Sequence, residues 1–123
     1  LLGQMRAQAD FITSLDMFRT MVARYPAAAA KLVENKANGP AIISTLRNKI
    51  PGVIPINPDG SKEARAFAIS PQVEAGQVFL PDPEIEGWVV DFLDEWGLFP
   101  NGTNDDQVDA STQALKRLGR EFD

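Results

Sequence analysis

Apolar side chains recur at helical spacing in several segments of the chain. In the segment 12–25 they repeat every three or four positions, and Pro26 stands where a helix must end. Thr13 or Ser14 is the expected cap of this helix. The same periodicity predicts further helices over 41–50, 61–69, 85–96 and 106–120, with Pro40 in the first turn of the second and Ser61 as the cap of the third.

Short apolar runs bounded by turn residues predict the strands. These runs are 1–6, the run that ends at Val33, 53–56 and 77–80. Strands and helices alternate, with crossovers long enough for βαβ units, so the fold class is α/β with a mostly parallel or mixed sheet. At 123 residues the chain is one domain at most, 1–123.

Composition narrows the chemistry available to the chain. There is no cysteine and no histidine, which excludes thiolate zinc sites and nucleophilic triads built on His or Cys. Any catalysis must use carboxylates, lysines, hydroxyls or a metal bound by oxygen. The net charge of −5 argues against nucleic-acid binding by bulk charge, although it permits a local basic groove. No apolar run approaches the ~20 residues that span a bilayer.

Three aspartates crowd the start of the last predicted helix, in "DDQVDA". Asp106 and Asp109 are three residues apart and lie on one helix face, where two like charges cost a few tenths of a kcal/mol. Asp105 or Asp106 is explained equally well as an N-terminal cap that interacts with the helix dipole. Asp109 lies beside Val108 and Ala110, and a carboxylate near an apolar face needs a partner or a metal.

A second acidic feature is Glu34, which ends the apolar run "KLVE". Side chains at the carboxyl ends of strands often carry the chemistry of α/β folds. The alternative is an ordinary ion pair with Lys31 or Lys36. Taken with the helix aspartates, Glu34 completes an oxygen-only ligand set that suits Mg²⁺ or Mn²⁺. Paired metals of this kind promote in-line displacement at phosphodiesters.

Four segments resemble, in order, the nuclease domain of the large terminase subunit of tailed phages and prophages. They are "LVENKANGPAIISTLR", "IPGVIPINPDGSKEARA", "SPQVEAGQVFLP" and "FPNGTNDDQVDASTQAL". The resemblance extends from about Leu1 to Leu118. It implies an RNase H-like fold, with a central mixed sheet flanked by helices and an acidic metal cluster.

The resemblance also implies site residues. The family's second metal ligand carries over to Glu34 and its third to Asp106 or Asp109, with Asp105 as a cap or further ligand. The family's first aspartate lies on a strand before the point where this sequence starts. The resemblance therefore implies an N-terminally truncated piece that is weak or inactive as a nuclease.

The function implied for the parent protein is that of a metal-dependent endonuclease. It would cut concatemeric viral double-stranded DNA during packaging, with two Mg²⁺ or Mn²⁺ ions. Lys36, Lys62 and Arg65 are then predicted to bind DNA, although Lys62 and Arg65 also fit an ordinary solvated helix start. The implied partners are DNA, the terminase ATPase domain of the same parent chain, the portal protein and the small terminase subunit, in the host cytoplasm and away from membranes.

Two rival functions fit the same residues. In the first, the chain is a non-catalytic docking module of the packaging motor that binds the portal or the ATPase domain. In the second, it is a resolvase-like nuclease that acts on branched DNA.

The segment 85–96 carries two further features. Trp88 and Trp96 share one helix face, which favours core packing over a partner surface. The acidic strip Asp91, Asp94 and Glu95 is interpreted as a solvated face.

Overall fold

The computed structural model describes the backbone of residues 1–122 and the side chains of residues 1–119. Contacts divide the chain into two compact units, one formed by 5–58 and the other by 1–4 together with the chain from Asp59 onward. In the described part of the chain, no helix combines the length and the apolar character that crossing a membrane requires. The α/β class is confirmed, with helices and a small parallel sheet.

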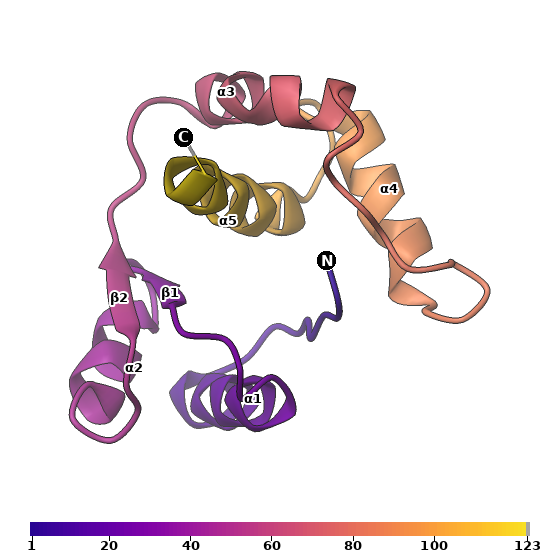
Figure 1. Cartoon of the computed structure of the whole chain (residues 1–123). Coiled ribbons are helices and arrows are strands. Elements are labelled where there is room, and N and C mark those ends of the chain that lie inside the picture. Colours follow the sequence, from indigo (N-terminus) through magenta and orange to yellow (C-terminus); the bar gives the residue numbers. More distant parts are fainter. Residues whose placement is uncertain (123) are drawn as a thin grey trace. The chain divides into compact units, whose positions relative to one another are not determined.

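The unit 5–58 contains a βαβ arrangement preceded by a helix (Figure 1). Its elements are α1 (Phe11–Arg24), β1 (Lys31–Glu34), α2 (Gly39–Leu46) and β2 (Val53–Ile56). The strands pair in parallel, with Lys31 opposite Val53 and Glu34 opposite Ile56. Buried Ile42, Ile43 and Leu46 of α2 form the core of this unit with Val33. Glu34 therefore stands at the carboxyl end of a strand, as the sequence predicted.

Helix α1 begins one turn earlier than its expected caps. Asp10 Oδ1 accepts a hydrogen bond from the backbone N–H of Thr13 at 2.8 Å. This bond lowers the pKa of the Asp10 carboxyl. The expectation that Thr13 or Ser14 caps the helix was wrong, because Asp10 already satisfies one of the free N–H groups of the first turn.

The turn after Glu34 brings the start of α2 against the end of β1. A Cβ atom at Gly39 would lie 1.9 Å from the carbonyl oxygen of Glu34 and 3.5 Å from Val33 Cγ1. Only glycine permits this approach of the two backbones. Pro40 occupies the first turn of α2, as predicted.

Replacing Gly39 tests this close approach. We expect Gly39→Ala to lower the free energy of unfolding by ~1–3 kcal/mol, because the new methyl group must displace the Glu34 carbonyl. Urea unfolding measures the change. Gly97→Ala is the control, since a Cβ at this helical glycine meets nothing within 4 Å and should stabilise by up to about 1 kcal/mol. Equal effects of both substitutions would contradict the packing argument.

In the second unit, which comprises 1–4 and the chain from Asp59 onward, the regular secondary structure of the described residues is helical. It contains α3 (Lys62–Glu74), α4 (Trp88–Leu98) and α5 (Asp106–Phe122), and both α3 and α4 pack on α5 (Figure 1). Ser61 caps α3 as predicted, its hydroxyl accepting the N–H of Ala64 at 3.1 Å. The buried apolar side chains of this unit are Ile69, Val89, Phe92 and Val108.

Helix α3 continues past the point where the sequence predicted its end. Pro71 lies inside the helix and has no N–H to donate to the carbonyl of Phe67, four residues earlier. The hydroxyl of Ser70 donates to this carbonyl at 2.7 Å and replaces the missing bond. The helix therefore runs on to Glu74.

Two predicted strands are absent from the described part of the chain. Residues 1–6 and 77–80 have no strand structure, although the amino group of Leu1 donates to the carbonyl of Phe79 at 2.9 Å. The helix predicted from 85 begins only at Trp88, and Ile85 is exposed. Within α5, Val108 is buried as expected, whereas Ala114 and Leu118 are exposed.

The aromatic side chains of α4 pack on one another, with Phe92 buried and Trp88 and Trp96 half-buried. The ring of Phe92 lies 5.8 Å from that of Trp88 and 6.5 Å from that of Trp96, measured between centroids. Phe99 extends the row at 6.4 Å from Trp96. These separations are typical of aromatic pairs inside proteins.

Candidate acidic site at the start of α5

The acidic site is built around the first turn of α5. Asp105 directly precedes the helix, and its carbonyl accepts the N–H of Asp109 at 2.9 Å, which is the first bond of the helical ladder. Asp106 follows as the first helical residue and is exposed. The side chain of Asp109, one turn further on, is only 14% exposed.

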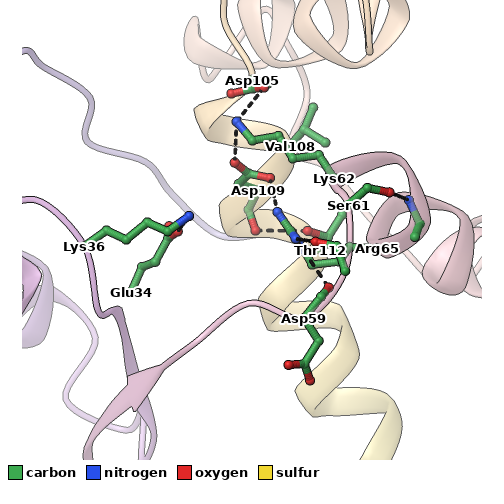
Figure 2. Close-up of polar contacts among 12 residues, drawn as sticks. Glu34, Lys36, Asp59, Ser61, Lys62, Arg65, Asp105, Val108, Asp109 and Thr112 are labelled. Carbon is green, nitrogen blue, oxygen red and sulfur yellow. Dashed lines mark hydrogen bonds and ion pairs between the residues drawn. The ribbon is translucent and has the colours of Figure 1, made fainter.

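One lysine joins two of these carboxylates. Lys62, the first residue of α3, places its Nζ 2.7 Å from Asp105 Oδ2 and 3.3 Å from Asp109 Oδ2 (Figure 2). The hydrogen bond to Asp105 is the main cause of a raised pKa at Lys62, and Asp109 adds to the effect. Asp105 and Asp109 thus converge on a single cationic atom.

Arg65 supplies a second cation to the same cluster. Its Nη2 lies 3.3 Å from Asp109 Oδ1, and its Nη1 donates to the carbonyl of Gly60 at 2.7 Å (Figure 2). The side chain of Arg65 is 12% exposed. The guanidinium therefore ties the Asp59–Gly60 turn, where Gly60 has φ +70°, to the carboxylate on α5.

The structure gives Lys62 and Arg65 a definite partner within the protein. Both were predicted to bind DNA or to form an ordinary solvated helix start. In the structure Lys62 is ion-paired with Asp105 and Asp109, and Arg65 with Asp109. Contact with DNA stays a prediction for these two residues. Beside Arg65, a cavity of about 350 Å³ lies between α3 and α5, and its polar lining includes Gln72, Gln113 and Lys116.

Glu34 and Lys36 form a separate pair in the unit 5–58. Glu34 Oε1 lies 3.5 Å from Lys36 Nζ, and the Lys36 side chain is 71% exposed (Figure 2). Lys31, the other partner considered for Glu34, donates to the carbonyl of Pro51 at 2.8 Å. Glu34 and the α5 aspartates belong to different units, so a metal ion shared between them stays a prediction.

Glu95 is buried beside the first turn of α5, so the prediction of a solvated face was wrong for this residue. Asp91 and Asp94 are exposed as expected, but Glu95 is only 7% exposed. Its Oε2 accepts the backbone N–H of Val108 at 2.8 Å, and its Oε1 accepts Gln107 Nε2 at 3.1 Å. The signal was present in the sequence, because position 95 follows Phe92 by three residues and so shares its buried face.

The donor chemistry of the cluster fits part of a divalent-metal site. Carboxylate oxygens of Asp105 and Asp109 already share one cationic atom, and hard oxygen ligands suit Mg²⁺ or Mn²⁺. Across the described residues, however, no group of three or more acidic side chains is placed to hold a metal. The α5 pair therefore supplies a partial ligand set.

The ion pair between Arg65 and Asp109 gives a direct test of this geometry. We expect Arg65→Met to lower the free energy of unfolding by roughly 1–3 kcal/mol, because Asp109 then loses a charged donor in a half-buried place. In a double-mutant cycle, adding Asp109→Asn should recover part of the loss.

Lys116→Met is the matched control for this cycle. Lys116 lies 3.9 Å from Asp59 in an exposed pair, so its loss should change stability by less than about 0.5 kcal/mol. Purely additive effects of Arg65→Met and Asp109→Asn would contradict a coupled pair.

A family model described as the terminase RNaseH-like domain matches residues 3–118. No curated protein and no solved structure gave a match. The family match extends over both compact units and includes all the acidic and basic residues described above.

Proposed function

Because this chain belongs to the terminase RNase H-like domain family, we propose that it is the nuclease domain of a phage DNA-packaging terminase, which cuts concatemeric double-stranded DNA with Mg²⁺ or Mn²⁺. Nuclease domains of the RNase H-like type typically use divalent metals. The observation that carries the proposal is the convergence of Asp105 and Asp109 on one cation at the start of α5.

Asp109 is the α5 residue that we propose as the main ligand. Its carboxylate is half-buried, and both of its oxygens face cations. Asp105 Oδ2 shares Lys62 with it, so Asp105 is the second ligand that the geometry favours. Asp106 is exposed and remains a predicted ligand from the family resemblance, as does Glu34 at the end of β1.

The residues around the carboxylates would each have a distinct task. Divalent cations at such a site stabilise the charge that develops on phosphodiester oxygens. Arg65 orients Asp109 while it stays bonded to the Gly60 carbonyl. A divalent cation bound by Asp105 and Asp109 would replace Lys62 as their partner. Lys62 would then be free to contact a DNA phosphate.

DNA would be held by local basic groups, because the whole chain carries a net charge of −5. Lys36 is exposed two residues after Glu34, and Lys62 is 44% exposed. Because both side chains are accessible to solvent, each can contact a DNA phosphate from the surface of the protein. In the packaging motor, we propose that the domain acts with the ATPase domain, the portal and the small subunit in the host cytoplasm.

Cleavage of linear double-stranded DNA by the terminase that carries this domain tests the proposal. With Mn²⁺ present, we expect Asp109→Asn to lower the cleavage rate by roughly a hundredfold or more, because the substitution removes a charged metal ligand. Asp94→Asn, an exposed carboxylate on α4, is the control and should cleave normally. Normal cleavage by the Asp109 variant would rule out the ligand assignment.

A further inference from the structure

We infer that Glu95 is a positioning residue for the acidic site. Its carboxylate lies on α4 and fixes the first turn of α5, so that Asp105 and Asp109 face the same cation. In the structure this cation is the Lys62 ammonium group. Only the step that puts a divalent metal ion in its place rests on the proposed function.

The first step concerns the bond that Glu95 makes. Val108 is the third residue of α5, and a helix-capping side chain usually accepts the N–H at this position. Asp105, directly before the helix, is the residue whose side chain would normally do so. In this protein the Val108 N–H donates to Glu95 Oε2 at 2.8 Å, and the Asp105 carboxylate bonds to Lys62. Glu95 therefore takes over a capping task and leaves Asp105 to bind a cation.

The second step concerns how firmly Glu95 is held. Glu95 is 7% exposed and Gln107 4% exposed, and Gln107 Nε2 donates to Glu95 Oε1 at 3.1 Å. Gln4 Nε2 donates in turn to Gln107 Oε1. A buried donor that loses its acceptor costs more than an exposed one, so this chain of hydrogen bonds restricts where the first turn of α5 can lie.

The third step connects that turn to the site. Val108 lies between Asp105 and Asp109, and the Asp109 N–H donates to the Asp105 carbonyl at 2.9 Å. Moving the backbone at Val108 would therefore change the separation of the two carboxylates. The carboxylate of Glu95 also adds negative charge at the positive end of the helix dipole, beside a cluster that binds cations.

Two conservative variants separate the hydrogen bond from the charge. Glu95→Asp keeps the charge but withdraws the acceptor from Val108 by one methylene. Glu95→Gln removes the charge but keeps one oxygen that can accept the Val108 N–H, and its NH₂ group can donate to Gln107 once the Gln107 amide turns over. Asp94→Asn, exposed on the same helix, is the control. All four proteins are compared as this chain, by amide hydrogen exchange and by NMR of the Asp105, Asp109 and Lys62 side chains.

We expect Glu95→Asp to speed exchange at the Val108 amide by roughly tenfold beyond any change at Ile69 in α3, because one hydrogen bond is lost. The carboxyl signals of Asp105 and Asp109 should move with it. The affinity for Mn²⁺ should fall by about tenfold, as for other groups that orient metal ligands. Glu95→Gln should keep the Val108 protection and the carboxyl signals close to those of the unchanged chain.

Unchanged Asp105 and Asp109 signals in Glu95→Asp would overturn the inference, even if Val108 exchanged faster, since Glu95 would then only stabilise the fold. Equal disturbance by both variants would also overturn it, because the charge and not the bond would matter. If the unchanged chain binds no Mn²⁺, the result counts against Asp105 and Asp109 as a metal site, while the exchange and carboxyl signals still decide the role of Glu95.

Discussion

The half-buried ion pair between Arg65 and Asp109 is the interaction on which the acidic site depends. Arg65 reaches from the first turns of α3 to the first turn of α5, and it also bonds the carbonyl of Gly60. One guanidinium thus fixes a turn, a helix start and a carboxylate together. Together with Lys62, it offsets the repulsion between the aspartates before and within the first turn of α5.

The negative charge of Asp105 and Asp109 is balanced by more than one cationic side chain. Lys62 binds both Asp105 and Asp109 from the exposed side, while the buried Glu95 serves the backbone of the same turn. Because the Val108 N–H donates to Glu95, the Asp105 side chain does not cap the helix and accepts a hydrogen bond from Lys62. The two carboxylates are thus oriented by the protein and share one lysine, whose side chain is 44% exposed.

Local signals in the sequence predicted the local structure well. The apolar periodicity predicted α1, α4 and α5, and the run 53–56 coincides with β2 (Val53–Ile56). The turn at Gly39 and the pairing of Glu34 with Lys36 were also within reach, because each involves residues close in the chain. The family resemblance, carried by four short segments, is confirmed by the family match.

Features set by distant contacts were not predictable in the same way. Lys62 and Arg65 find their partners more than 40 residues later, and no spacing rule connects them to Asp105 and Asp109. The apolar run 77–80 looked like a strand, but strand formation needs a partner with free backbone groups. The charge of Glu95 predicts exposure, as for Asp91 and Asp94, but its position three residues after Phe92 puts it on the buried face of α4.

The central claim, that Asp105 and Asp109 hold a divalent ion at the start of α5, is tested most directly by Mn²⁺ titration of this chain followed by amide NMR. The account predicts paramagnetic broadening that centres on Asp105 and Asp109 at the same low Mn²⁺ concentration. It also predicts that Asp109→Asn weakens the broadening at Asp105, whereas the exposed Asp94→Asn leaves it unchanged. Broadening at Asp105 that is indifferent to Asp109→Asn, or uniform broadening over the whole chain, would contradict it.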